Sequence, residues 1–169
     1  MNDVPLRSPA DEQAMDDEVA APTDAIVARL GGGRFAVELS RVAEVGRAPG
    51  ITRVPGLPNW LAGVANWRGR ILPVLDLRGL LGADTDPLDH RARLLVLAEG
   101  SIVVGMLVDA VEGTTMLGGD VAAFPPVSGP NGSGLLCGQV PRDDGPIAVL
   151  DVAAVLRLRE SLPRGRRTA

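Results

Sequence analysis

Residues 54–78, VPGLPNWLAGVANWRGRILPVLDLR, hold the pattern that decides the fold. Prolines and glycines punctuate the first part, an Arg-Gly pair follows at Arg68 and Gly69, and an apolar run then extends from Ile71 to Leu75. That order is typical of a tight loop that presents one cation at its tip and continues into a buried strand. We interpret the stretch as a docking loop carried on a β scaffold.

The composition of the whole chain favours one mostly β domain. A chain of 169 residues with 46% hydrophobic side chains is long enough to bury a core. Short runs of Val, Leu, Ile and Ala alternate with 21 Gly and 14 Pro, which predicts many short strands rather than long helices. The apolar run 101–108 is far shorter than the roughly 20 residues of a spanning helix, and the N-terminus is acidic where a secretory signal is basic. We therefore expect a cytoplasmic protein.

The two ends of the chain are predicted to be tails of opposite charge. Residues 1–23 carry six acids and one Arg, a segment too polar to repay the entropy of ordering, and we predict a disordered acidic tail. Residues 159–169 form an Arg-rich C-terminal tail. A few cations beside Pro and Gly at a terminus are expected to stay solvated, so we predict no nucleic-acid binding and no membrane insertion.

The first half of the domain begins with a predicted hairpin, because apolar runs flank the glycine triplet 31–33 within residues 25–39. The prolines of residues 48–58 exclude a regular helix and predict a long loop. Three apolar residues are expected to pack this loop onto the core: Trp60, Leu61 and Val64.

The predicted strand from Arg70 to Leu75 ends at an aspartate, Asp76. Since an aspartate before an apolar-periodic segment is a good N-cap, we expect a short helix through Leu81, closed by Gly82. Asp151 stands in the same relation to residues 152–156 and predicts a second capped helix.

The second half repeats the order of the first. Residues 93–108 form another predicted hairpin around a Glu99–Ser101 turn. A shift of 67 residues superposes the apolar positions of 35–39 on 102–106, and a shift of 75 superposes 74–77 on 149–152. The match indicates either an internal duplication or a chance likeness of common apolar residues. We predict two small antiparallel β barrels side by side, with a linker at about 82–92 and a flexible loop at 125–134.

No catalytic or metal-binding constellation stands out. An enzyme would recruit Asp76, Asp109 and Asp151, because acids at strand ends can share a cleft, but helix capping is the simpler interpretation of the first and third. We expect His90 to be solvated in the linker and Cys137 to be a small core residue. The glycine triplet lacks the Lys and Ser/Thr of a phosphate loop. We predict no enzymatic activity, cofactor or metal, and keep a small Asp-dependent hydrolase as the competing class.

Arg68 is the strongest candidate for recognition, because its guanidinium offers five fixed donors beside Gly69. It forms either a structural salt bridge, for which Glu44 is a candidate, or a contact with a partner, and the two are compatible. Trp67 is either a lid over the core or an exposed anchor, and we favour the lid. Three apolar positions are expected in the core: Leu39, Val42 and Val64.

The order of motifs resembles the CheW-like domain family of chemotaxis coupling proteins over about residues 24–158. The matching pieces are GRFAVELSRVAEV at 33–45, TRVPGLPNWLAGVANWRGRILPVLDLRGLLG at 52–82, GMLVDAVEG at 105–113 and GPIAVLDVAAVL at 145–156. The resemblance implies two SH3-like five-stranded barrels around a shared groove and no catalytic activity. It also implies partners, since family members couple methyl-accepting receptors to the CheA histidine kinase, whose regulatory domain has the same fold.

The resemblance also assigns candidate site residues. It places Val42, Glu44, Gly63, Asn66 and Arg68 in a receptor-facing groove, and segment 102–108 with the following loop on a kinase-facing surface. Trp67 replaces a residue that is usually smaller or aliphatic in the family, and loop 117–134 is unusually rich in Gly and Pro, so partner choice is expected to differ from that of a standard coupler. The chain is thus expected to be a non-catalytic adaptor recruited to receptor arrays. The alternative is a CheW-like scaffold in a phosphorelay for surface motility or development.

Overall fold

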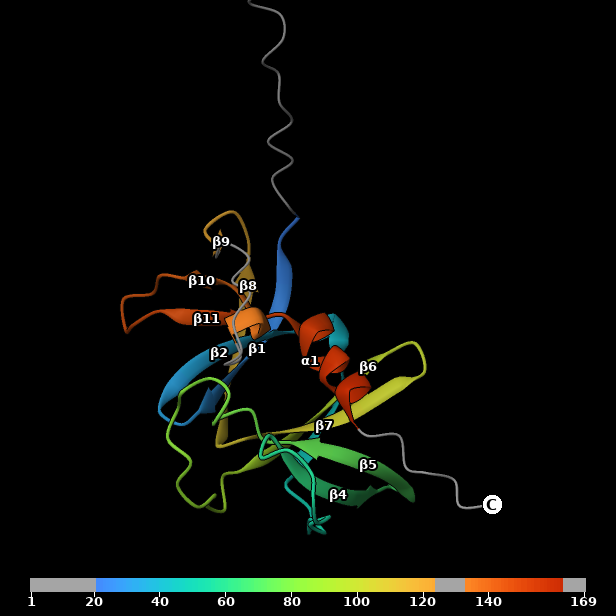
Figure 1. The fold of residues 1–169 in the computed structure, drawn as a ribbon. Coiled ribbons are helices and arrows are strands. Elements are labelled where there is room, and N and C mark those ends of the chain that lie inside the picture. Colours follow the sequence, from blue (N-terminus) through green and yellow to red (C-terminus); the bar gives the residue numbers. More distant parts are fainter. Residues whose placement is uncertain (1–20, 124–132, 163–169) are drawn as a thin grey trace, which may run out of the picture.

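The protein is built from two β sheets and one short α-helix. The computed structural model describes residues 21–123 and 133–162, and Figure 1 shows one sheet lying above the other with the helix beside their junction. The first sheet has the order β8-β1-β2-β11-β10-β9 and the second has the order β3-β6-β7-β5-β4. The prediction of a mostly β fold with two five-stranded modules is confirmed, with the two-residue β9 as an addition to the first module.

The strands have the following bounds. The first sheet consists of β1 (Thr23–Leu30), β2 (Gly33–Glu38), β8 (Ala110–Leu117), β9 (Ala122–Ala123), β10 (Leu136–Val140) and β11 (Ile147–Leu150). The second sheet consists of β3 (Val42–Arg47), β4 (Leu61–Trp67), β5 (Arg70–Leu75), β6 (Arg93–Glu99) and β7 (Ile102–Val108). The helices are α1 (Val152–Leu158) and three 3-10 turns, Leu39–Arg41, Ser133–Leu135 and Arg159–Ser161.

The two sheets do not divide the chain at the predicted linker. Residues 82–92 connect β5 to β6, and both strands belong to the second sheet. The N-terminal hairpin β1–β2 instead joins the C-terminal strands, because β2 pairs in parallel with β11. The chain therefore crosses from the first sheet to the second after β2 and returns at Asp109, between β7 and β8.

A repeated pattern of strand pairing accompanies this exchange of hairpins. Val74 on β5 faces Gly105 on β7, and Val149 on β11 faces Ala36 on β2. The pairing keeps the predicted shift of 75 between β5 and β11, but corrects the shift between β2 and β7 from 67 to 69. A register irregularity recurs as well, because Gly63 opposite Val74 corresponds to Gly138 opposite Val149. Each repeat thus contributes its hairpin to the sheet that the other repeat completes.

Three hydrophobic clusters follow from the alternation of side chains along the central strands. Val96 points into a cluster inside the second sheet, while its neighbours Leu95 and Leu97 point into a large core shared by both sheets and α1. On β2, Phe35 and Val37 enter the shared core, and the intervening Ala36 enters the cluster of the first sheet. Strands buried on both faces explain why these runs are continuously apolar.

The two predicted capped helices have different outcomes. Asp151 caps α1, accepting a hydrogen bond from the Ala154 backbone N–H at 3.0 Å, as predicted. Residues 78–82 form turns, so the helix predicted after Asp76 is wrong, although the Asp76 carboxylate accepts a hydrogen bond from the Arg78 backbone N–H at 3.2 Å. Gly79 and Gly82 weaken helix formation there, and the Asp76 carboxylate is occupied by Arg78.

Two other predictions need correction. Leu39 is 40% exposed at the 3-10 turn after β2, rather than in the core, while Val42 and Val64 are only partly buried. Cys137 lies exposed on β10 instead of inside the protein, because side chains alternate along the strand and Gly138 and Val140 occupy the buried positions.

The structure describes only parts of the predicted tails and of the flexible loop. Residues 1–20 of the acidic tail, 124–132 of the Gly/Pro-rich loop and 163–169 of the Arg-rich tail lie outside the described residues. β1 already begins at Thr23, and Arg159–Ser161 continues α1 as a 3-10 turn. Within residues 21–123 and 133–162, no helix has the length and apolar character needed to cross a bilayer.

Candidate functional site

The hairpin β4–β5 ends in a two-residue turn that presents Arg68. Trp67 pairs with Arg70 across the hairpin, and the two residues between them have φ angles of 48° for Arg68 and 79° for Gly69. Positive φ at both central positions matches the turns that suit the twist of a hairpin, although it is uncommon for an arginine. The Asn66 side-chain oxygen accepts a hydrogen bond from the Gly69 backbone N–H at 2.9 Å. Asn66 therefore stabilises the turn that exposes Arg68.

Side chains from the two edge strands of the second sheet meet beneath this turn. The Trp67 indole N–H donates to Glu44 on β3 at 2.8 Å, and Arg68 forms an ion pair with the other oxygen of the same carboxylate. The Trp67 ring also packs over Gly46, where a Cβ would lie 2.3 Å from the ring. The contacts close the sheet between β3 and β4, and they confirm both the lid role of Trp67 and the salt bridge between Arg68 and Glu44.

Gly63 holds the long loop against β4. Its φ is 147°, and a Cβ at this position would lie 2.2 Å from the carbonyl oxygen of Thr52. Thr52 and Val64 exchange two backbone hydrogen bonds, at 2.8 and 2.9 Å. Gly63 is buried, so it affects the surface only indirectly. Its lack of a side chain lets residues 48–58 pack closely against β4.

The five residues named from the resemblance therefore have different environments. Glu44 and Arg68 touch each other, Asn66 supports their turn, Gly63 is buried under the loop, and Val42 is a half-buried residue that packs against the shared core. Segment 102–108 is not an exposed surface, because β7 lies between β5 and β6 and its residues 104–108 are buried. That part of the expected kinase-facing surface is corrected by the structure.

One exposed apolar residue beside the turn escaped the sequence reasoning. Ile71 pairs with Asn66 across the hairpin and is 67% exposed. Period-two alternation of β5 indicates it, since Leu72 and Val74 face the core of the second sheet and Ile71 must face the other way. The outer face of the hairpin therefore combines an apolar side chain with the cations at its tip.

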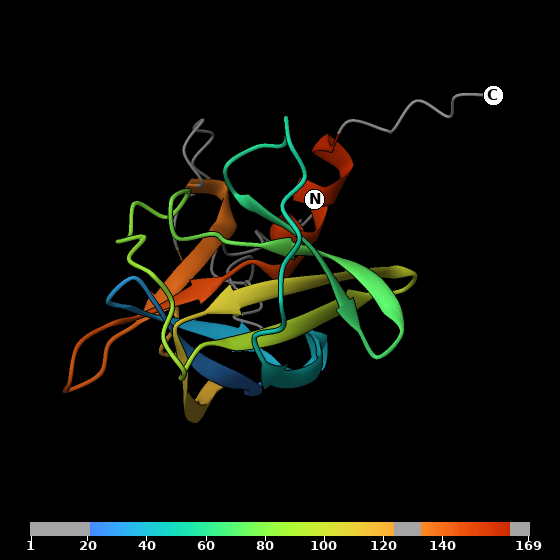
Figure 2. The ribbon, with the colours of Figure 1, turned by 90° about the horizontal axis from the view of Figure 1, so that it is seen from below.

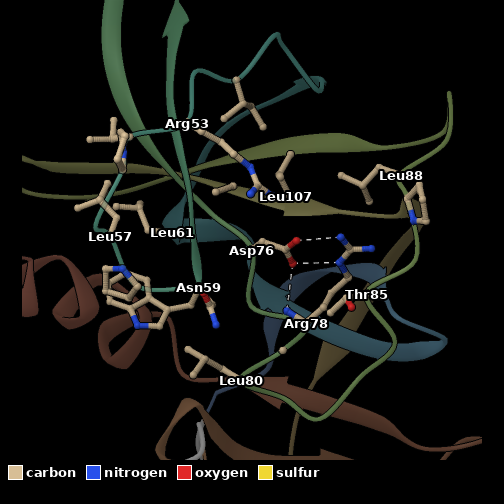
Figure 3. Close-up of a pocket in the computed structure, with 18 of the residues that line it drawn as sticks. Arg53, Leu57, Asn59, Leu61, Asp76, Arg78, Leu80, Thr85, Leu88 and Leu107 are labelled. Atoms are coloured by element: carbon tan, nitrogen blue, oxygen red, sulfur yellow. Dashed lines mark hydrogen bonds and ion pairs between the residues drawn. The ribbon is translucent and has the colours of Figure 1, made fainter.

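A separate groove of about 1110 Å³ lies between the long loop and the linker. Its walls are Ile51, residues 53–62, Asp76, residues 78–80, residues 85–88 and Leu107. None of the five residues named from the resemblance lines it. Figure 3 shows Arg53 and Leu57 on one side of this groove and the pair Asp76–Arg78 on the other.

Arg78 is the one charged residue that is buried within the described part of the chain, and the sequence analysis missed it. Its guanidinium donates to both carboxylate oxygens of Asp76, at 2.9 and 2.8 Å, and to the carbonyl oxygen of Asp86 at 2.7 Å. Burial works to raise the pKa of Asp76, but the side-chain and backbone hydrogen bonds from Arg78 outweigh it and hold that pKa below its usual value. The signal was present as the Asp-Leu-Arg triplet at the end of a strand.

The acids of the competing hydrolase hypothesis do not form a catalytic site. Asp76 and Asp109 both contact Arg78, whereas Asp151 caps α1 in the other repeat. A carboxylate with a lowered pKa is a poor proton shuttle at neutral pH. Partial desolvation, followed by the charge of Asp151, raises the pKa of the Cys137 thiol and so disfavours its nucleophilic form. His90 is exposed, and residues 21–123 and 133–162 contain no group of three potential metal ligands.

Paired β modules, a shared core and a braced hairpin tip define a two-module β scaffold. The model of the CheW-like domain family matches residues 24–160. The chain belongs to the CheW-like domain family, whose members are non-catalytic scaffolds.

Named relatives and a solved structure agree with this membership. The chain is 42% identical to Protein PilI of Pseudomonas aeruginosa over 50% of this chain and 48% of that protein. It is 38% identical to Protein FrzA of Myxococcus xanthus over 56% and 66%, and 32% identical to Chemotaxis protein CheW of Bacillus subtilis over 56% and 61%. The chain thus spans about half to two thirds of the length of these relatives. The crystal structure of scaffolding protein TtCheW from Thermoanaerobacter tengcongensis matches with a TM-score of 0.68 at 25% identity, covering 77% of this chain and 89% of that one.

Proposed function

We propose that this chain is a cytoplasmic adaptor that couples methyl-accepting chemoreceptors to a CheA-type histidine kinase. The observation that carries the proposal is the hairpin tip, where the Arg68 side chain is 76% exposed although its turn, its neighbour Trp67 and its partner Glu44 fix its position. A fixed but solvent-facing guanidinium suits recognition, because little side-chain entropy is lost when it binds.

The surroundings of Arg68 supply the other elements of a docking surface. Glu44 occupies one side of the guanidinium, so the remaining N–H donors are available to a carboxylate or carbonyl oxygen of a receptor. Ile71 offers apolar area on the same hairpin. An apolar residue bordered by charged groups is the usual composition of a protein–protein contact. We assign Asn66 and Gly63 supporting roles in this surface, with Val42 at its base.

A second candidate keeps the adaptor role but changes the pathway. Two of the relatives, Protein PilI and Protein FrzA, have names without the word chemotaxis, and PilI matches at higher identity than the Bacillus subtilis chemotaxis protein. A CheW-like scaffold in a phosphorelay that governs surface motility or development would use the same hairpin with a different receptor and kinase.

The test is capture of the two partners by the purified full chain. The regulatory domain of a CheA-type kinase and the cytoplasmic hairpin of a methyl-accepting receptor, both from the same genome, are titrated separately against immobilised wild-type protein and two variants. Arg68→Ala removes the braced guanidinium, and Arg70→Ala removes a neighbouring exposed cation as the matched control. We expect both partners to bind the wild type, and receptor binding to weaken at least several-fold more in Arg68→Ala than in Arg70→Ala.

Two results would contradict the proposal. If the folded wild-type chain captures neither partner, the adaptor function is wrong. If Arg68→Ala binds the receptor as the wild type does, the adaptor function stands but its assignment to Arg68 fails. Cells that lack the chain distinguish the two pathways, because loss of swimming chemotaxis supports the first candidate and loss of surface motility alone supports the second.

A further inference from the structure

Arg78 joins three segments of the second module at one point. It reaches Asp76 at the end of β5, the carbonyl oxygen of Asp86 in the linker and the Asp109 carboxylate at 3.3 Å, where β7 passes into β8. Its side chain is only 8% exposed. The hydrogen bonds that Arg78 donates to Asp76 raise the already high pKa of Arg78, so this buried charge is permanent.

Asp109 extends these contacts into the first module. Its other carboxylate oxygen accepts a hydrogen bond from the backbone N–H of Gly31 in the β1–β2 turn, and its own N–H donates to the Arg29 carbonyl oxygen at 2.8 Å. The turn also abuts the linker, since a Cβ at Gly31 would lie 2.5 Å from the carbonyl oxygen of Asp84. A continuous polar chain thus runs from Asp76 through Arg78 and Asp109 to the hairpin of the other sheet.

The remaining contact between the modules is mostly apolar. The shared core combines Phe35 and Val37 of the first sheet with Leu95, Val104 and Met106 of the second. Apolar burial is strong but non-directional, so it constrains the angle between the two sheets less sharply than directional contacts do. Hydrogen bonds between charged groups are directional, and a buried ion pair often contributes less to stability than well-packed apolar residues would. We therefore expect the Arg78 ion pairs to affect the angle between the two sheets more than the stability of the fold.

A comparison of the described parts of the two repeats shows that only one of them has the buried arginine. Under the shift of 75 residues, Asp76 corresponds to Asp151, but Arg78 corresponds to Ala153 in α1. The fold can complete a repeat without a buried arginine, as the second repeat does with a helix. The arginine lies where the hairpin turn, the linker and the crossing between sheets converge.

We propose that Arg78, acting through Asp109, is a positioning residue that fixes the orientation of the first β module relative to the second. The orientation sets the spacing between surfaces on the two modules. If the chain is the adaptor proposed above, Arg78 controls how a partner on one module is placed relative to a partner on the other, without touching either of them.

Spin-label distance measurements test the orientation directly and need no partner. One label uses the exposed native Cys137 on β10 of the first module, and the other uses Ile71→Cys on β5 of the second. We compare the labelled chain with versions that carry Arg78→Met, Arg78→Lys or Asp109→Asn. The matched control is Arg34→Met, because Arg34 also has a mostly buried side chain and two acidic partners, Glu112 and Asp144, but all three belong to the first module.

The expected result is a narrow distance distribution in the parent that shifts or broadens in the Arg78 and Asp109 variants and stays unchanged in Arg34→Met. Thermal unfolding of every variant accompanies the measurement, and only folded variants are compared. A purely structural role predicts a lower midpoint with an unchanged distribution, which would overturn the proposal. An equally broad distribution in the parent would also overturn it. The Asp109→Asn variant keeps the test decisive if Arg78→Met does not fold.

Discussion

The ends of β5 and β11 occupy equivalent places in the two repeats, yet the chain continues from them differently. Each strand leads into an aspartate whose backbone N–H donates to a carbonyl oxygen just before the neighbouring strand. Asp76 donates to Trp60 before β4 at 2.8 Å, and Asp151 donates to Leu135 before β10 at 2.7 Å. After Asp151 the chain forms α1, and after Asp76 it forms turns around a buried arginine.

The difference shows that the residues after the aspartate decide whether its carboxylate caps a helix or pairs with a cation. Ala153 and Ala154 follow Asp151 and favour a helix, so the carboxylate caps it. Arg78 and Gly79 follow Asp76, so the carboxylate binds the guanidinium and the helix does not start. One repeat thereby acquires an apolar helix against the shared core, and the other acquires a polar junction between modules.

The largest expected effect is the difference in unfolding free energy between alanine variants of the two aspartates. Asp76→Ala leaves the Arg78 charge buried with only part of its partners, which is expected to lower the free energy of unfolding by about 3 kcal/mol. Asp151→Ala removes one helix cap and is expected to cost about 1 kcal/mol. Urea denaturation of both variants checks the order. Equal losses would mean that the Asp76–Arg78 pair is no more than a cap-like contact.

The equivalent glycines of the two register irregularities provide the next comparison. Gly63→Ala combines a φ of 147° with a Cβ 2.2 Å from a backbone oxygen, and we expect a loss of about 2 to 3 kcal/mol. Gly138→Ala meets the Ala122 carbonyl oxygen at 2.7 Å without the unusual φ, so about 1 to 2 kcal/mol is expected. Thermal unfolding measures both. A larger loss at Gly138 would show that the loop before β4 yields more readily than β9.

Acid titration sharpens the comparison at Asp76. Because its folded-state pKa is lowered, its pairing with Arg78 stabilises the protein above the ordinary aspartate pKa of about 3.9, and the benefit is lost as the pH falls through the lower folded-state value. The difference in unfolding free energy between wild type and Asp76→Asn should therefore be constant from about pH 5 upward and shrink below about pH 4. A difference that stays constant to the lowest pH at which both proteins fold would contradict the assignment.

The smallest expected effect concerns the exposed arginine of the hairpin. Arg68 pairs with Glu44 as Arg78 pairs with Asp76, but its side chain is 76% exposed, so solvent screens the pair. Arg68→Ala is expected to lower the free energy of unfolding by less than about 1 kcal/mol. Trp67→Phe, which removes the indole donor to Glu44, is expected to cost about 1 kcal/mol. Chemical denaturation checks both. Unfolding of Arg68→Ala would show that its role is structural.

Local sequence patterns predicted the strands well, because the start and end of a strand depend on residues close to it in the sequence. The β1–β2 and β6–β7 hairpins, the strand Arg70–Leu75 and the Asp151 cap follow from alternation, glycine turns and capping. The exchange of hairpins between sheets did not follow, because the parallel pairing of β2 with β11 joins residues more than a hundred positions apart. The pairing of Arg78 with Asp76 is local, but its burial did not follow from the sequence, because its other acceptors lie in separate segments at Asp86 and Asp109.

Reconstitution of kinase control tests the adaptor function most directly. Receptor cytoplasmic fragments assembled on vesicles are mixed with a CheA-type kinase from the same genome, and autophosphorylation is measured with and without the purified chain. The account predicts that the receptor changes the kinase rate only when the chain is present, and less with Arg68→Ala than with Arg70→Ala. A kinase rate that responds to the receptor equally with and without the folded chain would contradict it.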